Sequence, residues 1–437
     1  MKLTQLKVMF VTAGCTKLYA KPLAENDNSK NQVYFGPGFN ALNLFPNTGV
    51  FPDSSPKNPI FKAKLQFGWL LPNGQVAEVP TAQLILYPQY PEVRFSGFLK
   101  GCKLAPSELM AGRINGRVLF LGVTGRCVVG FVVGANSEIA AEFRALNLEP
   151  RDGVFVELGL PTIPSGEDSR AKLLNELSRI NQLGWIDSKQ LDSKGILKPC
   201  NAAQCGGFTL EAELGIPKNS DAEPDFLGWE VKQYAVENFE KIESAKPITL
   251  MTPEPTGGFY KDKSPEAFVR KFGYADKSGI VDRMNFGGRH YVGRRCPPTG
   301  LTMQLVGFNA ATGKITDANG AITLVSDTGE VAAAWAFGKI LEHWSHKHMK
   351  AAYVPSQCRK EPGRQYAYGH KVRLAERTDS LRLLAALADG GVYYDPGIKL
   401  ENVSSKPEMK RRSQFRVASK NISALYETVE VVEVKNF

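Results

Sequence analysis

One short stretch, residues 224–232, constrains this chain most, because it places three charged side chains inside an apolar segment. Asp225 lies five residues before Glu230, and Lys232 follows two residues later. Alternate side chains of a strand share a face, so we expect Glu230 and Lys232 to point the same way, with Val231 turned into the core. The stretch therefore predicts a strand with a charged edge.

Asp225 enters from the bend before that strand, which Pro224 and Gly228 help to shape. Two carboxylates and an ammonium at one sheet edge suit a hard divalent cation that takes oxygen ligands and keeps several waters. Asp-x4-Glu-x-Lys is a common spacing, and most instances are solvated surface charges. Here the neighbours are apolar, and charges in a buried strand need a compensating partner. We therefore favour a metal-dependent site for phosphodiester hydrolysis.

Composition and charge are those of a basic globular protein. The 437 residues predict two or three domains, and 43% hydrophobic and 22% charged residues allow a sizeable core. The net charge of +10 favours a polyanionic partner, although many basic proteins bind no nucleic acid.

Targeting signals are not evident in the sequence. The first twenty residues lack a clean apolar core and a cleavage site, and no run of 18 apolar residues predicts a membrane span. Seven scattered cysteines favour reduced thiols in a cytoplasmic protein over a disulfide framework. Cys200 and Cys205 have no second pair at ligand spacing, which argues against structural zinc.

Residues 1–150 predict a mostly-β domain, built as a small barrel or pseudobarrel. Runs at 61–71 and 75–87 flank the turn signal Pro-Asn-Gly at 72–74, and a second hairpin is expected around 124–126. Helical periodicity is confined to short pieces such as 137–146. Proline and glycine cluster after 150, so we expect a linker at 151–165 and a second domain at 166–437.

Two polar, basic loops of the first domain are candidate DNA-gripping arms, at 21–32 and 91–103. Amide, guanidinium and hydroxyl groups can bond base edges, and lysines can meet phosphates. Ordinary surface loops are the alternative. The candidate DNA-binding residues of these arms are Lys21, Asn26, Gln32, Arg94, Ser96 and Lys100.

A string of small identities in this domain resembles the N-terminal effector domain of EcoRII-type restriction enzymes. The match runs through Lys21-x-Leu-Ala-x-Asn-Asp27, Gln32-Val33, Pro37-Gly38 and Leu44-Phe45-Pro46, then Glu92-x-Arg94-x-Ser96. It covers about residues 15–135. The resemblance implies a pseudobarrel that reads DNA without cutting it.

The second domain opens with a predicted helix at 167–183, whose leucines repeat at helical spacing. A short amphipathic helix around 209–216 carries Glu211, fourteen residues before Asp225. The whole string Leu-Glu-x-x-Leu-Gly, Pro-Asp-Phe and Gly-Trp-Glu-Val-Lys resembles the MvaI/BcnI restriction endonuclease family and the related nickase MutH, within the PD-(D/E)xK nucleases.

This resemblance implies an α/β nuclease domain with a central mixed sheet. Asp225 and Glu230 would hold Mg²⁺, Lys232 would serve the attacking water, and Glu211 would be an auxiliary acid. It also implies a monomeric catalytic unit that cuts double-stranded DNA at a short GC-rich site of the CC-x-GG kind. With an EcoRII-like domain attached, a second copy of the site is expected to stimulate cleavage.

Beyond the motif, the sequence predicts strands at 247–251, 301–308, 321–326, 352–355 and 428–434, and helices at 264–272 and 331–350. The strand at 247–251 is expected in the central sheet beside the catalytic strand. The helix 331–350 ends in His343-x-x-His346-x-His348, which we interpret as a polar end facing solvent or DNA rather than zinc.

Three basic segments of the second domain are candidate DNA contacts. Residues 282–295 form a glycine-rich run whose four arginines and one histidine, His290, suit phosphate or groove contact, and 410–416 is a basic cluster; solvated surface is the alternative for both. Residues 357–368 are where we expect major-groove base readout. The candidate residues are Arg289, Arg294, Arg295, Arg359, Lys360, Arg364, Arg411 and Arg412.

Two rival functions remain open from the sequence. A MutH-like repair nickase would answer to a partner protein, and the extra DNA-reading domain argues against it. A catalytically silent DNA-binding module would not need Glu211, Asp225, Glu230 and Lys232 together. We therefore favour a site-specific, Mg²⁺-dependent deoxyribonuclease of a restriction-modification system.

Overall fold

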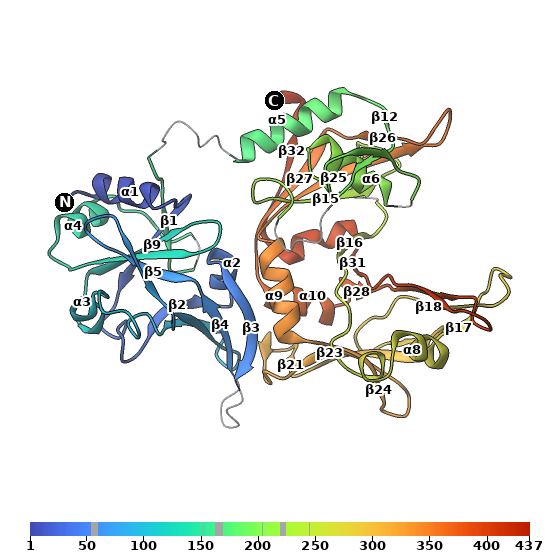
Figure 1. Cartoon of the computed structure of the whole chain (residues 1–437), viewed down its shortest axis with the longest axis horizontal. Coiled ribbons are helices and arrows are strands. Elements are labelled where there is room, and N and C mark those ends of the chain that lie inside the picture. The colour runs from blue at the N-terminus through green and yellow to red at the C-terminus, as the bar shows by residue number, and fades with distance from the viewer. Residues whose placement is uncertain (54–59, 152, 162–168, 203, 219–223, 244) are drawn as a thin grey trace. The chain divides into compact units, whose positions relative to one another are not determined.

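The structure, a computed structural model, describes residues 1–53, 60–151, 153–161, 169–202, 204–218, 224–243 and 245–437 (Figure 1). The chain divides into two compact units: unit 1 is residues 1–166 with 314–319, and unit 2 is 167–313 with 320–437. No helix in the described ranges is long and apolar enough to cross a membrane. Part of the predicted linker and residues 219–223 of the motif region lie outside the described residues.

The first sheet of unit 1 has six strands in the order β11-β1-β9-β10-β5-β6. Both predicted hairpins are confirmed, because β5 pairs with β6 and β9 with β10, each antiparallel. Residues 156–158 pair with β1, so the prediction of a linker is wrong there: Val156 and Leu158 are buried in the core. The strands are β1 Lys17–Leu23, β5 Phe67–Leu70, β6 Val76–Val79, β9 Arg117–Val123, β10 Val128–Val133 and β11 Val156–Leu158.

The second sheet of unit 1 has five strands in the order β2-β8-β7-β4-β3. Aromatic rings join the two sheets: Phe35 of β2 contacts Phe95 of β8 and Phe155, and Phe95 contacts Phe67 of β5. Each centroid distance in these contacts is 5.0 Å. The strands are β2 Val33–Pro37, β3 Asn47–Asp53, β4 Ile60–Leu65, β7 Gln83–Tyr87 and β8 Glu92–Ser96. The mostly-β composition agrees with expectation, and closure into a pseudobarrel stays a prediction.

Helices of unit 1 cover the six-stranded sheet. Phe10 of one helix and Phe143 of another share an apolar cluster with Phe120 of β9. The helix predicted at 137–146 is confirmed, and its N-cap Ser137 accepts a hydrogen bond from Ala140 N at 3.1 Å. The helices are α1 Leu3–Thr12, α2 Ala41–Leu44, α3 Ser107–Ala111 and α4 Glu138–Ala145.

Unit 2 is organised around a mixed sheet of six strands. The order is β12-β26-β25-β27-β32, and β15 joins β25 in the one parallel pairing of this sheet. Its strands are β12 Ile186–Asp187, β15 Glu230–Ala235, β25 Lys350–Arg359, β26 Gln365–Tyr368, β27 Lys371–Thr378 and β32 Tyr426–Glu433. The strand predicted at 352–355 is therefore confirmed within β25, and the one at 428–434 is confirmed as β32 except for its last residue, which begins a 3-10 helix.

One face of this sheet packs against two helices, α5 (Ser169–Gln182) and α6 (Cys205–Glu213). Leu177 of α5, Leu210 of α6 and Val231 of β15 are all at most 5% exposed in one apolar cluster. The leucine repeat that predicted the first helix is thus the buried stripe of α5. Arg373, on the other face in the row of Lys232 and Tyr353, donates to Ser419 of the 3-10 helix η1 (Ser419–Leu425).

The rest of unit 2 consists of smaller sheets and helices. Three sheets have the orders β16-β31-β28, β17-β18-β29-β30 and β19-β20-β23-β24, and β13 pairs with β14. Their strands are β13 Lys189–Leu191, β14 Leu197–Pro199, β16 Ile248–Met251, β17 Tyr274–Ala275, β18 Arg283–Gly287, β19 Arg295–Cys296, β20 Leu301–Val306, β23 Ala321–Val325, β24 Val331–Ala336, β28 Val392–Tyr394, β29 Gly397–Glu401, β30 Glu408–Lys410 and β31 Phe415–Val417. The remaining elements of unit 2 are α7 Phe259–Asp262, α8 Pro265–Phe272, α9 Phe337–Lys347, α10 Ser380–Ala388, β21 Phe308–Asn309 and η2 Val434–Asn436, whereas β22 Lys314–Ile315 belongs to unit 1.

Two predictions for unit 2 are wrong. The helix expected at 331–350 begins only at Phe337, because 331–336 pair with β23 as strand β24. The strand at 248–251 exists, but it pairs with β31 in a separate sheet rather than joining β15. The helix predicted at 264–272 is confirmed as α8, with Ser264 as its N-cap.

Candidate active site

A tight turn aims Asp225 at the start of β15. Phe226 and Trp229 exchange two backbone hydrogen bonds of 2.9 and 2.8 Å, and between them Leu227 and Gly228 have φ values of +48° and +85°. Two successive positive φ values produce a turn that a glycine accommodates easily. The carboxylate Oδ2 of Asp225 accepts a hydrogen bond from Val231 N at 3.0 Å. The bend predicted from Gly228 therefore ties Asp225 to the strand.

Glu230 and Lys232 share one face of β15, as the spacing predicted. Lys232 Nζ lies 2.5 Å from Glu230 Oε1, and the two side chains are 24% and 2% exposed. Val231 between them is 5% exposed and packs in the opposite apolar cluster. The pair is thus sealed on the glutamate side and open to solvent on the lysine side.

The pair is charged in both members. Burial alone would raise the pKa of Glu230, but the neighbouring positive charges, led by the Lys232 ammonium, and the hydrogen bond from Lys232 together outweigh burial and lower that pKa to about 2. Burial alone would lower the pKa of Lys232, but Glu230 and Asp225 raise it to about 12. An opposite charge at hydrogen-bond distance favours both charged forms. Lys232 is therefore a donor at neutral pH and not a free base.

Two further carboxylates hold their protons more tightly than usual. Burial, reinforced by repulsion from Asp225, raises the pKa of Glu211 on α6 to about 7. Burial, reinforced by repulsion from Glu230, raises the pKa of Asp225 to about 6. Glu211, Asp225, Glu230 and Lys232 therefore form one electrostatic cluster in which the carboxylates outnumber Lys232.

The cluster leaves one acceptor unused. Glu230 Oε2 is buried and has no hydrogen-bond partner within the described part of the chain. A buried carboxylate oxygen without a partner is costly, and a cation beside it would remove that cost and the repulsion among the acids. No group of three or more His, Cys, Asp or Glu side chains in the described ranges is arranged to hold a metal. Asp225 and Glu230 fit a hard ion that draws its other ligands from water or phosphate.

Helix α9 adds two residues that the sequence analysis missed. Lys347 favours the ionised forms of Glu211, Asp225 and Glu230, against the larger effect of burial. Burial, with smaller contributions from Lys347 and Lys232, lowers the pKa of His343, and Glu230 opposes this shift. Residues four apart share a helix face, so His343 and Lys347 flank the cluster together. Their sequence signal was weak, because nothing in it linked α9 to β15.

The predicted polar end of this helix is wrong for its last histidine. His348 is fully buried, its ring stacks on Trp344 with centroids 4.1 Å apart, and its Nε2 bonds Leu250 O at 3.1 Å. Burial lowers the pKa of His348 to about 3, so it is neutral. It supports the fold beneath Glu230 instead of facing solvent or DNA.

A disulfide joins Cys200 to Cys205 at the start of α6, with Cα atoms 5.8 Å apart. The prediction that all cysteines are reduced is therefore wrong for this pair. Both residues are buried, and their five-residue separation closes a small loop before the helix that carries Glu211. The chain has an odd number of cysteines, scattered along the sequence, and this pattern did not indicate that two of them form a bond.

Comparison with known proteins decides the family. A profile described as the MvaI/BcnI restriction endonuclease family matches residues 174–426, more than half of the chain. The chain belongs to the MvaI/BcnI restriction endonuclease family. It is therefore a DNA-cleaving hydrolase, and the family resemblance read from the motif is confirmed. No curated protein matches the chain.

Two solved structures of restriction endonuclease MvaI are similar to this MvaI/BcnI-family chain. The complex with cognate DNA substrate has 15% sequence identity and a TM-score of 0.44, and the match covers 61% of this chain and 99% of that one. MvaI in the absence of DNA has 15% identity and a TM-score of 0.33, with coverage of 62% and 100%.

In this MvaI/BcnI-family enzyme, the hairpin β25–β26 holds the residues predicted for base readout. Arg359 donates to Gln365 Oε1 at 2.6 Å, and its guanidinium lies 4.7 Å from the Trp185 ring centroid. Arg364 donates to Ala202 O at 2.7 Å, so it is partly engaged, whereas Lys360 is exposed at the tip.

The other residues of unit 2 predicted to contact DNA differ in their exposure to solvent and in whether another side chain already holds them. Arg295 is held by Asp327 at 2.8 Å. His290 is fully buried and bonds Thr299 Oγ1, so the groove contact imagined for that histidine is wrong. Arg295 is nevertheless exposed, as are the other arginines of the predicted set, Arg289, Arg294, Arg411 and Arg412.

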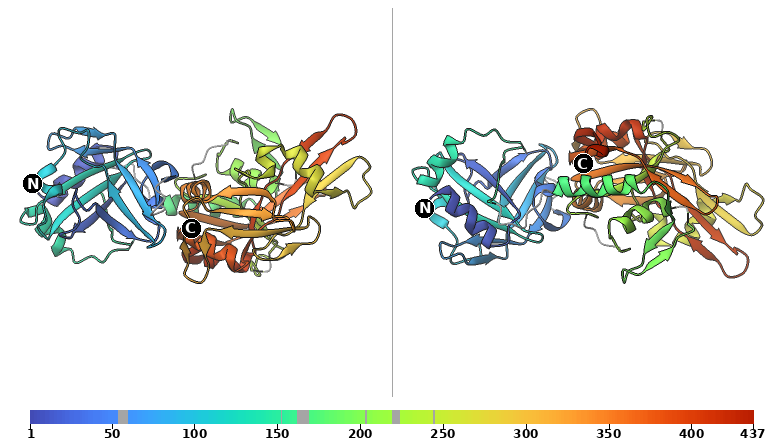
Figure 2. Two further views of the ribbon diagram at one scale, coloured as in Figure 1. Left: turned by 90° about the horizontal axis from the view of Figure 1, so that it is seen from below. Right: turned by 90° about the horizontal axis from the view of Figure 1, so that it is seen from above.

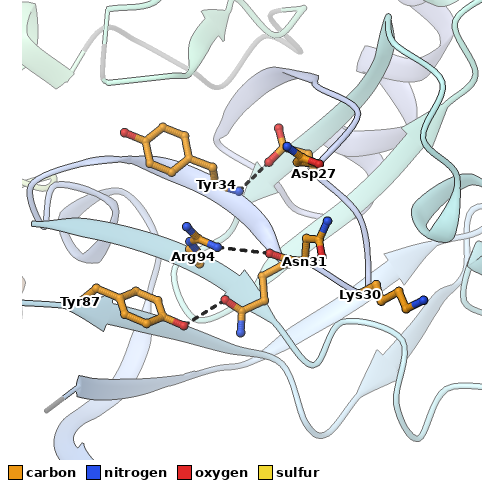
Figure 3. A pocket seen from close by; sticks show the side chains of 8 residues that line it. Asp27, Lys30, Asn31, Tyr34, Tyr87 and Arg94 are labelled. Carbon is orange, nitrogen blue, oxygen red and sulfur yellow. Dashed lines mark hydrogen bonds between the residues drawn. The ribbon is translucent and has the colours of Figure 1, made fainter. Parts of the chain in front are cut away.

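Three of the six predicted contacts of unit 1, Asn26, Gln32 and Arg94, line one hollow of about 560 Å³ (Figure 3). Tyr87 donates to Gln32 Oε1 at 3.2 Å, and Arg94 lies 5.5 Å from the Tyr87 ring centroid. Ser96 and Lys100 are not among its lining residues, which are Asn26, Asp27, Lys30, Asn31, Gln32, Tyr34, Tyr87 and Arg94. Lys21 is 4% exposed and bonded to Asp27, so the predicted phosphate contact by Lys21 is wrong.

Proposed function

We propose that the chain is a Mg²⁺-dependent type II restriction endonuclease that hydrolyses phosphodiesters of double-stranded DNA at a short GC-rich site of the CC-x-GG kind. The observation that carries the proposal is the unused, buried Glu230 Oε2 beside Asp225 and a protonated Lys232. Family membership supplies the reaction class, and this cluster supplies groups suited to it.

Asp225 and Glu230 would hold the cation through one carboxylate each. When bound, Mg²⁺ would neutralise charge on the scissile phosphate and increase the acidity of a nearby water. Lys232, kept protonated by Glu230, would donate a hydrogen bond to the attacking water and stabilise negative charge on the phosphate. Its partner Glu230 fixes the direction of that ammonium.

Glu211 and Lys347 would complete the centre from two helices. With a pKa near 7, Glu211 is able to take up and release a proton at working pH. Lys347 would meet a DNA phosphate next to the acids, because its positive charge offsets the repulsion between the carboxylates and the polyanion. Both roles are proposals of position and charge.

Specificity would come from the β25–β26 hairpin. The Arg359 guanidinium is positioned by its hydrogen bond to Gln365 and its contact with the Trp185 ring. A positioned guanidinium suits a bidentate hydrogen bond to guanine O6 and N7, which is worth about 1–3 kcal/mol against a wrong base. Lys360 and Arg364 would add donors at the same tip. Phosphate contacts would come from Arg289, Arg294, Arg411 and Arg412.

Unit 1 would bind a second copy of the site through its polar hollow, as in an EcoRII-like effector domain. Donors and acceptors converge there from Asn31, Gln32 and Arg94. We expect a one-site plasmid to be cut more slowly than a two-site plasmid by the full chain, which would act as a monomer. Equal rates, in cis and in trans, would exclude this effector role.

Arg94→Ala should remove that stimulation while leaving one-site cleavage within about twofold, because Arg94 lies in unit 1 and outside the catalytic cluster. The measurement is the ratio of two-site to one-site cleavage rates. Arg126→Ala, an exposed arginine of the β9–β10 turn in the same unit, is the matched control. A stimulation ratio unchanged by Arg94→Ala would exclude the hollow as the effector site.

Digestion of a sequenced plasmid by the full chain tests the central proposal. With Mg²⁺ we expect defined double-strand ends that map to one short GC-rich sequence, and no cutting in EDTA or by Asp225→Asn. Nicks without double-strand cuts would favour a MutH-like nickase. Binding without any cutting would favour a silent DNA-binding module.

A further inference from the structure

An arm of unit 2 carries two apolar side chains at its tip. The arm is the sheet β17-β18-β29-β30, and its tip is the turn 276–282 between β17 and β18. Val281 is 89% exposed, more than any other large apolar side chain in the described ranges, and its neighbour Ile280 is 50% exposed. Single exposed apolar residues are ordinary, but two adjacent ones at the end of a projecting sheet form a small apolar point.

The tip is braced from its base by Asp276. Oδ1 of Asp276 accepts hydrogen bonds from Ser278 N at 2.8 Å and Ile280 N at 3.3 Å. Oδ2 accepts from Arg283 Nε at 2.8 Å and Asn285 Nδ2 at 2.6 Å. The Asp276 side chain is 3% exposed. One buried carboxylate therefore ties both strands of the hairpin to the backbone of the turn.

The turn between β29 and β30 braces the other side of the tip. Ser404 donates through its backbone N to Asp282 Oδ1 at 2.8 Å and through its hydroxyl to Asp282 Oδ2 at 2.9 Å. Val403 N also donates to Asp282 O at 3.2 Å, and Arg270 of α8 donates to Val403 O at 2.9 Å. A loose loop would fold its apolar side chains back onto the protein. This turn instead holds Ile280 and Val281 out in water, and a part held in its binding conformation loses less entropy on binding.

Charge next to the tip favours a polyanion. Lys277 in the tip is exposed, with its ammonium 5.0 Å from the Tyr274 ring centroid, and Lys406 in the facing turn is exposed too. The arm and the β25–β26 hairpin project from the same side of unit 2 in Figure 1, and the arm again forms an end of that unit in both views of Figure 2. An apolar point with one lysine on its own turn and another on the facing turn suits a DNA groove, where base and sugar edges lie between two lines of phosphates.

From these observations we propose that Ile280 and Val281 form a wedge that packs into a groove of the bound duplex, while Lys277 and Lys406 meet the flanking phosphates. The wedge rests on the DNA-cleaving function proposed above. It adds a sequence-independent hold on DNA by a part of unit 2 outside the predicted base-reading hairpin.

The test compares full-length variants on the same plasmid fragment, with Ca²⁺ in place of Mg²⁺ during binding measurements. Ile280→Ser with Val281→Ser should weaken DNA binding about tenfold and leave the log–log dependence of affinity on salt unchanged, because no ionic contact is lost. Lys277→Ala with Lys406→Ala should instead reduce that slope by about 1.8, or 0.9 per phosphate contact. Ile280→Leu with Val281→Leu should retain the affinity of the unchanged chain.

Controls keep the result specific to the wedge. Val431→Ser removes another half-exposed valine of unit 2 and should leave affinity unchanged. Equal thermal unfolding of all variants checks that they fold.

If the unchanged chain cuts plasmid with Mg²⁺ and the double serine variant binds equally well, the wedge is wrong while the nuclease proposal stands. If the unchanged chain neither binds nor cuts, both proposals fail. Self-association that the double serine variant loses, at unchanged DNA affinity, would assign the tip to a second copy and overturn the wedge.

Discussion

Two buried lysine–carboxylate pairs, one in each unit, have the same length and opposite surroundings. Lys21 Nζ lies 2.5 Å from Asp27 Oδ2 in unit 1, and Lys232 Nζ lies 2.5 Å from Glu230 Oε1 in unit 2. Asp27 is fully used, since its Oδ2 also accepts from Ala24 N at 3.1 Å and its Oδ1 from Tyr34 N at 2.7 Å. Glu230 keeps Oε2 free of any partner in the described ranges.

The pKa values of the two lysines shift in opposite directions. Burial lowers the pKa of Lys21 despite Asp27, whereas Glu230 and Asp225 overcome burial and raise the pKa of Lys232 to about 12. The side chain of Lys21 is 5% exposed and that of Lys232 is 24% exposed. The difference between the pairs indicates that the Glu230–Lys232 pair suits a reactive role, because an acceptor is unused and a path to solvent remains. A closed pair of the same length stabilises a loop.

The strongest test of this comparison is to remove charge from the pair that is open to solvent, Glu230 and Lys232, which we call the open pair; Lys21 and Asp27 are the closed pair. Glu230→Gln should reduce DNA cleavage by about 10³-fold. The substitution removes the negative charge of the carboxylate proposed to hold the cation and keeps the shape of the side chain. The measurement is single-turnover cleavage with Mg²⁺. DNA binding in Ca²⁺ and thermal unfolding serve as controls. Near-normal cleavage would make the open pair structural, like its counterpart in unit 1.

Removing charge from the closed pair should affect folding instead. Asp27→Ala leaves the Lys21 ammonium buried alone and should reduce the free energy of unfolding by about 3–5 kcal/mol. Chemical denaturation of the full chain, followed through the transition of unit 1, is the measurement. Lys62→Ala breaks the exposed pair with Asp53 in the same unit and should cost less than about 1 kcal/mol. Equal costs for the two variants would contradict the distinction.

Lys347 of α9 provides a second test of the open pair, because its positive charge lies near the acidic side chains. Lys347→Ala should slow cleavage on the order of tenfold to a hundredfold, because one positive charge beside the acids is lost. Lys339→Ala, an exposed lysine of the same helix that is 65% exposed and paired with Glu342, should leave the rate unchanged. Comparable losses in the two variants would mean that only the overall charge of α9 matters.

The open pair should also respond to pH through its neighbours. Glu211 and Asp225 have pKa values raised to about 7 and about 6, so protons compete with a cation as pH falls through this range. Mg²⁺ affinity should therefore fall by up to about tenfold per pH unit for each proton displaced. The metal-free protein should lose stability as pH rises from 4.5 toward 7, because the folded chain binds protons there that the unfolded chain has released. Calorimetric titrations between pH 5.5 and 8 measure the first effect, and Glu211→Gln should reduce the slope. A flat profile would contradict the raised pKa values.

Local signals in the sequence predicted local structure well. The turns at 72–74 and 124–126, the caps Ser137 and Ser264, and the leucine stripe of α5 each fix a backbone conformation through near neighbours. The candidate site shared this advantage, because Asp225, Glu230 and Lys232 lie on one turn and one strand.

Long-range features could not be predicted in the same way. Residues 331–336 fit a helical apolar face equally well, and they form a strand only because β23 offers an edge. The membership of β16 in another sheet, the Cys200–Cys205 bond and the position of Lys347 all depend on which segments meet after folding. The sequence predicted Lys21 as a DNA-contacting residue of an arm, because it gives no sign that Lys21 and Asp27 are buried together as a pair.

Strand β25 has one further consequence. Its residue Ala351 lies beside Glu230, and eight residues later the same strand reaches Arg359 at the turn end of the predicted reading hairpin. A continuous strand rises about 3.3 Å per residue, so one stretch of backbone spans about 26 Å between the two positions. Under the proposed function, that span would fix the distance between the scissile phosphate at the catalytic cluster and the bases contacted by the hairpin. Exchanging the tip of the hairpin should therefore change which sequence is chosen and leave the offset of the cut within it constant.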